Sequence, residues 1–501
     1  MRKYVLTRLL RSLVSIIAVI AIVYVLIYSL IPRDNIFLND PIYTKMSTQD
    51  LKTNYRYQRF EQFGYVDYAT MGDYCKVLYP DLTSIDNFNC NRASTPTFTN
   101  PAINDFNQYY ANLGYTTQYL TSGKPYAYKD NSPFSMMLKW FSTIITFQHV
   151  NQVQNELEPD IERSIYIGRD WNNVPALMCS GCENKYLIYF DNSFPFIHFN
   201  FVKLNLGNSF PLFADRDIIN VISSGQGNNV ITDITYPTGL AEASDVNEHT
   251  CVYKPTLSPF EQARFTDNYA SCQAYYSDPS MLSTSFSIGI LAMLLSYVIG
   301  LPIGIFMAKY KNRTFDKIAM LYIIFIIAVP SLAYIFMFSR IGAAIGLPVK
   351  FPVYGAHNSL SYILPIFSLA LPAAAGLMMW IRRFMIDQTS SDYVKFARSK
   401  GLTETEIFSK HILRNAIIPI VHGIPMSIVG TLTGAIITER VYAVPGMGKM
   451  LTSSINAFDN SLIVALTFIF TALSVLALLL GDILITFVDP RISFVESGGR
   501  K

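Results

Sequence analysis

The sequence predicts an all-α polytopic membrane protein of six transmembrane helices, into which an extracellular domain of mixed α/β or mainly β character is inserted. Three observations predict this fold class. The chain has 501 residues, of which 51% are hydrophobic and only 15% are charged. Its apolar residues gather into long uncharged runs, and all six cysteines lie in one long polar segment between the first two runs. This composition excludes an ordinary soluble protein.

Six runs are long enough to cross the hydrocarbon core, which takes about 20 apolar residues because every backbone amide must be bonded within the helix. They cover residues 12–32, 280–308, 318–339, 358–381, 415–438 and 461–481. The first run follows four basic residues, as a cleaved signal peptide does, but it is too long for one and lacks a small-residue cleavage pattern before Pro32. We therefore expect it to remain as the first span.

The distribution of lysine and arginine predicts the orientation. Of these residues, eighteen lie on the side that holds both termini, whereas the short loops opposite hold only Arg340, Lys350, Arg440 and Lys449. Positive short loops stay in the cytoplasm, so we expect a multi-pass plasma membrane protein with both termini cytoplasmic. The expected parts are residues 1–32 (N-terminus and first helix), 33–279 (extracellular inserted domain), 280–490 (five-helix membrane core with the cytoplasmic loop 382–414) and 491–501 (cytoplasmic tail).

The cysteines support this orientation, because disulfides persist in oxidising compartments and all six lie in the segment expected outside. Connectivity stays open, although nearness in the sequence favours Cys75 with Cys90, Cys179 with Cys182 and Cys251 with Cys272. Two cysteines at the spacing of Cys179 and Cys182 can also share a metal or form a redox pair. No second pair of that spacing accompanies them, so no metal site is predicted.

Residues 33–279 hold 17 basic and 26 acidic residues, so the outer segment is acidic and the rest of the chain is basic. Anionic lipid on the cytoplasmic side accounts for the basic part without nucleic acid. Within the outer segment, residues 185–190 and 194–202 are rich in aromatic and β-branched residues and predict strands.

The loop between the fourth and fifth spans predicts two short helices. Gly401 is a natural terminator for the first, and Thr403 followed by Glu406 matches a capping box that opens the second. Apolar residues recur at helical spacing in the second helix, at Ile407, Phe408 and Ile412, with Glu404, Lys410 and Arg414 on the polar side. We expect the apolar face to be covered by a partner protein, because no other part of the chain on the cytoplasmic side is large enough to cover it. The alternative is a helix that lies flat on the lipid.

This loop resembles that of the permease subunits of oligopeptide and dipeptide ABC importers (binding-protein-dependent transport system inner membrane component), whose pattern is Y-V-x-x-A-x-x-K-G-L followed by H-x-L-R-N-A-x-x-P. The matching residues are Tyr393, Val394, Ala397, Lys400, Gly401, Leu402, His411, Leu413, Arg414, Asn415, Ala416 and Pro419. Lys395 and Phe396 replace the Glu and first Ala of the wider EAAxxxG motif. Residues 441–451 resemble the family's PG-x-G segment, and 489–492 its DPR ending; the unusually large segment 33–279 departs from the family.

The resemblance implies the type I ABC importer architecture and ATP-driven import of oligopeptides or dipeptides by alternating access. It implies as partners a homologous permease subunit in a heterodimer, two ATPase subunits, an extracellular peptide-binding protein and the lipid bilayer. The residues expected to couple to the ATPase are Ala397, Lys400, Gly401, Leu402, Glu404, Ile407, Phe408, His411 and Arg414. ATP and Mg²⁺ would bind those partner subunits, since this chain has no G-x-x-x-x-G-K-[ST] phosphate loop and is not expected to be an enzyme or to carry a cofactor.

Other interpretations of the chain remain open at this stage. It can be a surface receptor or adhesin on a permease-like core, an importer of nickel or another small solute, or a passive channel. Two polar residues inside spans are also functional candidates. We expect Asp482 to pair with Arg382, Arg383 or Arg414 at the cytoplasmic end, and His422 either to line a pore or to bond a neighbouring helix.

Overall fold

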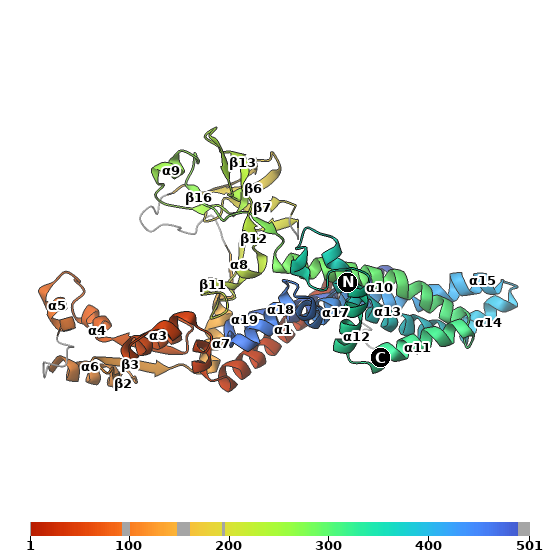
Figure 1. Ribbon diagram of the computed structural model, residues 1–501, viewed down its shortest axis with the longest axis horizontal. Helices are drawn as coiled ribbons and strands as arrows, with labels where there is room; N and C mark the ends of the chain where they lie inside the picture. Colours follow the sequence, from red (N-terminus) through yellow and green to blue (C-terminus); the bar gives the residue numbers. More distant parts are fainter. Residues whose placement is uncertain (1, 93–100, 148–160, 193–195, 489–501) are drawn as a thin grey trace, which may run out of the picture.

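The computed structural model describes residues 2–92, 101–147, 161–192 and 196–488. Figure 1 shows a bundle of long helices from which two lobes leave in different directions, while the short helices α14 (Asp392–Ser399) and α15 (Glu404–Glu406) lie at the opposite end of the bundle. The tail predicted at 491–501 and the DPR motif at 489–491 lie outside the described residues.

Within the described part of the chain, five helices are long and apolar enough to cross a membrane. They are α1 (Arg2–Leu30), α10 (Met281–Lys309), α13 (Leu360–Thr389), α17 (Ile418–Tyr442) and α19 (Asn460–Val488). Helices α10 and α13 pack together along their length, and α19 packs against both α1 and α17. Gly304 permits the close approach of α10 to α13, because a Cβ there would lie 2.9 Å from the Cα of Met378. Small residues at such crossings let two membrane helices meet backbone to backbone.

The third predicted span, 318–339, is not one straight helix, and that prediction is wrong in this respect. Helix α11 (Thr314–Ala328) and helix α12 (Ser331–Ala344) meet at an angle of 115°. The break lies at Val329 and Pro330, where Val329 is extended with φ −87° and ψ 128°. Proline disfavours the helical conformation in the residue before it and donates no backbone hydrogen bond, so the helix ends there. The bent pair can form a sixth, broken span or a re-entrant loop.

The first lobe covers residues 33–130 and is mainly helical. Its three-stranded antiparallel sheet has the order β1-β3-β2, with Val66 opposite Asp130 and Thr116 opposite Tyr128. Tyrosine and phenylalanine rings fill its core, and the disulfide between Cys75 and Cys90 joins α4 to α5. The elements are η1 (Arg33–Phe37), α2 (Pro41–Lys45), α3 (Gln49–Gln62), β1 (Val66–Thr70), α4 (Met71–Leu78), α5 (Ile85–Arg92), α6 (Pro101–Asn112), β2 (Thr116–Tyr119) and β3 (Pro125–Asp130).

The second lobe, residues 164–278, is mainly β. A four-stranded antiparallel sheet runs in the order β5 (Ser164–Arg169), β6 (Pro175–Ser180), β7 (Tyr186–Phe190) and β8 (Ile197–Phe199). Strand β7 lies in the segment predicted as a strand at 185–190, and β8 in that predicted at 194–202, of which Phe194 and Pro195 lie outside the described residues. The structure joins Cys179 to Cys182 and Cys251 to Cys272. The remaining elements are η2 (Glu248–Thr250), α8 (Ile218–Ser223), α9 (Pro259–Gln262) and the strand pairs β12 (Gln226–Asn229) with β17 (Tyr276–Asp278), β13 (Thr232–Thr235) with β14 (Ala241–Ser244), and β15 (Val252–Tyr253) with β16 (Tyr269–Ser271).

Both lobes are anchored on the first turn of α19. The Asn460 side chain donates to the Tyr65 hydroxyl of the first lobe at 2.9 Å, and the Ser209 hydroxyl donates to the buried Asp459 carboxylate. Ser209 belongs to β10 (Asn208–Ser209), which pairs with β11 (Arg216–Asp217) just before α8. Apolar side chains of α8, with Ile144 and Leu206, complete the contact with α19 and α18 (Met447–Ala457). Ile144 follows α7 (Pro133–Thr143), and next to it β4 (Ile145–Phe147) pairs with β9 (Val202–Leu204).

Candidate functional site

The loop 382–414 folds as a helical hairpin at the end of the bundle farthest from the first lobe (Figure 1). Helix α14 ends at Ser399, and Gly401, which follows the C-cap residue Lys400, has a φ of +78°. The Gly401 amide donates to the Arg398 carbonyl and the Leu402 amide to the Ala397 carbonyl, which is the hydrogen-bond pattern of a Schellman motif. Glycine adopts this left-handed conformation at no steric cost. The chain therefore turns sharply at Gly401 and re-enters a helix within three residues.

The second arm of the hairpin starts with the capping box that the sequence predicts. The Glu406 amide donates to the Thr403 hydroxyl at 3.4 Å, and the Glu406 carboxylate accepts from the Thr403 amide at 3.1 Å. Helix α15 then widens into a π-helical turn, Ile407–Ile412, before α16 (Leu413–Ala416) leads into α17. A π-helical turn holds one extra residue and is frequent at functional positions.

The apolar face of the hairpin is covered by this chain itself, which corrects the expectation that only a partner could cover it. Val394, Ala397, Ile407 and Ile412 are buried in one cluster with Ala308 of α10 and with Ile381 and Met385 of α13. The membrane helices extend beyond the apolar runs, with α13 continuing to Thr389, and this extra length provides the covering surface. Ala397 and Ile407 therefore fix the hairpin to the bundle and present no side chain for a partner.

The exposed end of the hairpin is a different set of residues, which we call the tip: Phe396, Lys400, Gly401 and Leu402. The Phe396 side chain is 61% exposed, and the Lys400 ammonium lies 4.5 Å from the centroid of its ring. Of the other predicted coupling residues, Glu404 and Arg414 are exposed, and Phe408 and His411 are half-buried. Sequence reasoning did not select Phe396. Phe396 directly precedes Ala397 and therefore lies on a different face of α14 from Val394 and Ala397. This position was the feature from which its exposure could have been predicted.

One charged pair stiffens the tip. The Arg398 guanidinium donates two hydrogen bonds to the Glu404 carboxylate, at 2.7 and 3.1 Å, and so joins α14 to α15 across the turn. The hydrogen bond from Arg398 lowers the pKa of the Glu404 carboxyl, and the same bond raises the pKa of Arg398. Both groups are exposed, so the pair orients the turn more than it stabilises the fold.

A cavity of about 640 Å³ opens along one face of the bundle, between α10, α12, α13 and α17. Its lining runs along α13 from Ser368 to Phe384, which is about 24 Å of helix at 1.5 Å per residue and so most of the hydrocarbon thickness. The lining contains no charged side chain and no histidine among the described residues. Hydroxyl groups and four aromatic rings supply its polarity and shape: Ser296, Tyr297, Ser331, Tyr334, Ser368, Ser427, Thr431, Thr438, Trp380 and Phe384.

The predicted pairing of Asp482 with Arg382, Arg383 or Arg414 is wrong. Asp482 of α19 forms an ion pair with Arg8 of α1 and lies 3.2 Å from Nε2 of His422 on α17. The reason is that α19 packs between α1 and α17, whereas Arg382 extends from α13. His422 therefore bonds a neighbouring helix and does not line the cavity.

Arg382 instead holds α13 to α11. Its Nε and Nη2 donate to the two oxygens of Asp316, each at 2.7 Å. Asp316 is buried at 3% exposure, and its Oδ2 also accepts from the Asn312 amide at 2.9 Å. Arg383 is exposed and lies 5.5 Å from the centroid of the Trp380 ring. The bidentate pair fixes the end of α13 from which the hairpin starts.

At the opposite end of α17, a buried carboxylate organises the PG-x-G segment. Glu439, 1% exposed, accepts from the Ser285 hydroxyl at 2.6 Å and from the Lys449 amide at 2.8 Å, while the Met447 amide donates to Ser285 at 2.9 Å. A Cβ at Gly446 would overlap the Glu439 carboxylate, so the glycine gives this carboxylate room beside the chain. The motif is thereby tied to both α10 and α17.

Comparisons with known proteins add to this geometry. The family described as "Binding-protein-dependent transport system inner membrane component" matches residues 300–494. The oligopeptide transport system permease protein AmiC of Streptococcus pneumoniae serotype 4 is 39% identical over 508 residues, which cover 100% of this chain and 100% of that protein. The dipeptide transport system permease protein DppB of Lactococcus lactis subsp. cremoris is 33% identical over 46% of this chain and 77% of its own length. A solved structure of the MetNI methionine ABC transporter in an inward facing conformation is 16% identical, with a TM-score of 0.32, over 41% of this chain and 93% of that one.

Proposed function

This chain belongs to the family of binding-protein-dependent transport system inner membrane components, and from that premise we propose how it couples the energy of a partner ATPase to transport. It is a permease subunit of an ABC importer of peptides, a function carried by its full-length relationship to an oligopeptide permease. Such a permease works with ATPase subunits and a substrate-binding protein. It lies in the plasma membrane and crosses it several times.

We propose that the tip is the surface that the ATPase contacts. Phe396 is a large exposed aromatic side chain on a hairpin whose apolar residues Val394, Ala397, Ile407 and Ile412 are buried in this chain. A rigid support with one protruding anchor suits docking into a groove, since little flexibility is lost on binding. Movement of the ATPase would pass through Val394 and Ile407 to α10 and α13, because these residues are buried in one cluster with side chains of those helices.

We propose that the cavity is the path of the peptide and that its open face meets a homologous permease subunit. The lining residues lie on α10, α12, α13 and α17 and leave one face of the cavity open, and a second subunit on that face would close the path. Hydroxyl groups and aromatic rings can contact a peptide backbone and varied side chains without selecting a charge. Nickel would need imidazole or carboxylate ligands, which the described lining does not offer.

We propose that both lobes lie outside the cell and that loop 382–414 lies in the cytoplasm. The excess of lysine and arginine on the side of that loop supports this orientation, as do the disulfides in the lobes. Residues 33–279 would then be the extracellular inserted domain, and 280–490 the membrane core. ATP and Mg²⁺ would bind only the partner subunits, and the two permease subunits would form a heterodimer.

A Phe396→Ala variant tests the docking surface. It is expected to weaken binding of the ATPase subunits by about 2 kcal/mol, which is about 30-fold, because truncating a central aromatic anchor removes most of its buried apolar area. The measurement is the affinity of the purified permease in nanodiscs for its co-expressed ATPase, together with peptide uptake in reconstituted vesicles. Lys395→Ala, on the same helix and also exposed, is the control and should change neither. Equal affinities for wild type and Phe396→Ala would exclude the tip as the contact.

A Gly401→Val variant tests the turn. A β-branched residue at φ +78° costs about 1–2 kcal/mol, and the cost lies in the backbone alone because a Cβ added at this position would meet no atom within 4 Å. We expect ATP hydrolysis to continue while uptake falls, with Gly401→Asn much less impaired because asparagine tolerates this conformation. Gly376→Ala is the control, since Gly376 also has free space but an ordinary helical φ. Uptake by Gly401→Val equal to that of Gly401→Asn would show that the turn geometry is unimportant.

A further inference from the structure

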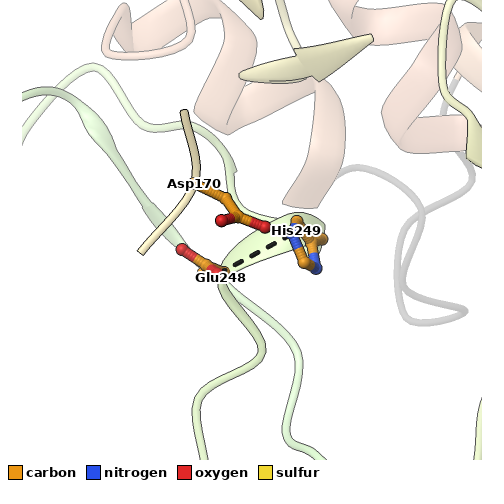
Figure 2. A group of neighbouring side chains, drawn as sticks. All are labelled: Asp170, Glu248 and His249. Atoms are coloured by element: carbon orange, nitrogen blue, oxygen red, sulfur yellow. Dashed lines mark hydrogen bonds and ion pairs between the residues drawn. The ribbon is translucent and has the colours of Figure 1, made fainter. Parts of the chain in front are cut away.

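Three metal-ligating side chains converge inside the second lobe, far from the hairpin and the cavity. Asp170 directly follows β5, whereas Glu248 and His249 lie in η2, with His249 79 positions after Asp170 along the chain. All three are buried, with exposures of 8%, 6% and 7%. Figure 2 shows the carboxylates of Asp170 and Glu248 turned toward the imidazole of His249. One donor atom from each residue lies within 4.8 Å of the other two.

The hydrogen bonds around the cluster divide the carboxylate oxygens into two sets. Asp170 Oδ1 accepts from the Val174 amide at 2.7 Å, and Glu248 Oε2 accepts from the Trp171 amide at 2.8 Å. These bonds fix the outer oxygen of each carboxylate. The inner oxygens, Oδ2 of Asp170 and Oε1 of Glu248, face Nε2 of His249 at 2.9 and 3.7 Å. Fixing the outer atoms while the inner atoms stay aligned is how proteins orient metal ligands.

The position of His249 is also fixed. Its ring stacks on Tyr189 with centroids 4.4 Å apart and meets Tyr186 edge to face at 5.2 Å. Nε2 can carry only one proton, so it can donate to one of the two inner carboxylate oxygens at a time. Glu248 Oε1 lies 3.7 Å from Nε2, which is too far for a good hydrogen bond. Glu248 Oε1 also accepts a weak hydrogen bond from the Asn172 side-chain amide at 3.3 Å.

The charge of the cluster is poorly balanced. Two carboxylates are buried together, which is costly unless a cation neutralises them. The Lys185 ammonium is paired with Asp267 at 2.9 Å and so is not the counter-charge of the two carboxylates. A divalent cation between the inner oxygens and Nε2 would balance the two carboxylates.

We propose that Asp170, Glu248 and His249 form a binding site for a first-row divalent metal ion, Zn²⁺ or Mn²⁺, in the second lobe. Metal bonds of about 2.0–2.2 Å place tetrahedral donors about 3.3–3.6 Å apart, between the two distances that the inner oxygens make to Nε2. The single imidazole favours these ions over Ca²⁺ and Mg²⁺, which take oxygen ligands in larger number. The ion would join the turn after β5 to η2, next to the disulfide of Cys251 and Cys272.

The test uses the full-length chain, purified in detergent without a polyhistidine tag and stripped with a chelator. Zn²⁺, Mn²⁺, Ca²⁺ and Mg²⁺ are each added, and bound metal is measured by elemental analysis after desalting, alongside the thermal unfolding midpoint. We expect one Zn²⁺ or Mn²⁺ per chain and a higher midpoint with that metal. Asp170→Asn and His249→Gln should each weaken binding by at least about 10-fold.

The matched control is His198→Gln. His198 stacks on the same Tyr189 ring at 4.8 Å and lies 2.9 Å from Asp191, but it is not one of the three converging residues. This variant should bind metal as wild type does. If a cluster variant fails to fold, the absorption spectrum of the Co²⁺-loaded wild type decides, because nitrogen and oxygen ligation gives no thiolate charge-transfer band. Absence of stoichiometric metal in wild type, equal binding by His249→Gln and His198→Gln, or a thiolate band would overturn the proposal.

Discussion

An Arg382→Ala variant is expected to be less stable than wild type by about 3–5 kcal/mol, because it leaves the buried Asp316 carboxylate without its bidentate partner. The remaining hydrogen bond, from the Asn312 amide, cannot compensate for the lost charge. Helix α11 should loosen from α13 at the point where the hairpin begins. The measurement is unfolding of the purified chain in mixed micelles of increasing SDS content.

Two further variants distinguish the loss of the ion pair between Arg382 and Asp316 from non-specific destabilisation. Arg383→Ala removes the neighbouring arginine, whose exposed guanidinium lies over the Trp380 ring, and should cost less than about 1 kcal/mol. The double variant Asp316→Ala with Arg382→Ala should be more stable than Arg382→Ala alone, since no buried charge is left unpaired. A double variant less stable than either single variant would mean that the pair matters for packing and not for charge.

A Glu439→Ala variant should be less stable than wild type by a similar amount, on the order of 4 kcal/mol. Glu439 lies at the end of α17 that is farther from the hairpin. The substitution removes the acceptor of the Ser285 hydroxyl and the Lys449 amide and opens a cavity beside Gly446. Hydrogen bonds to a charged group contribute about 1.5–3 kcal/mol each, and a buried donor left unbonded adds a cost of its own. The PG-x-G segment is expected to become accessible, so faster hydrogen exchange at Met447 and Lys449 is the measurement.

Arg440→Ala is the matched control for that experiment. Arg440 is the next residue of the same helix, is exposed, and makes a long hydrogen bond of 3.4 Å to Thr452. Its loss should leave exchange in the segment unchanged. If Glu439→Ala exchanges as slowly as Arg440→Ala, the segment is held by packing of Met447 and Met450 and not by the carboxylate.

The membrane helices were predictable because the bilayer sets a length and excludes charge, and both can be read from the sequence. The break at Val329 and Pro330 lies within an apolar run, so hydrophobicity alone does not reveal it. The proline was the residue from which a helix break could have been predicted. Aromatic segments such as that around Tyr57 and Phe60 suit a strand or a buried helix equally well, so the prediction of a mixed α/β or mainly β domain did not place helices in the first lobe.

For the candidate site too, features that depend on neighbouring residues could be predicted from the sequence, and features that depend on distant residues could not. Gly401 and the pair Thr403 with Glu406 act within a few residues, and the sequence locates the turn and the cap. Which surface covers Ile407, and which of several basic residues reaches Asp482, depends on helices far away in the chain. The cluster of Asp170 with Glu248 and His249 has no spacing that a motif could capture, since the fold alone brings the two segments together.

The attachment of both lobes at Asp459 and Asn460 has a mechanical consequence. Asp459 caps α19 and Asn460 is its first residue, so a tilt of that helix would move both lobes with it. For a given rotation, the displacement of an atom increases with its distance from the attachment point. A rotation of a few degrees, which would shift the membrane helices only slightly, would therefore displace the far end of the first lobe by much more. The lobes would thus magnify the conformational cycle of the membrane core, and a probe on α5 would register it.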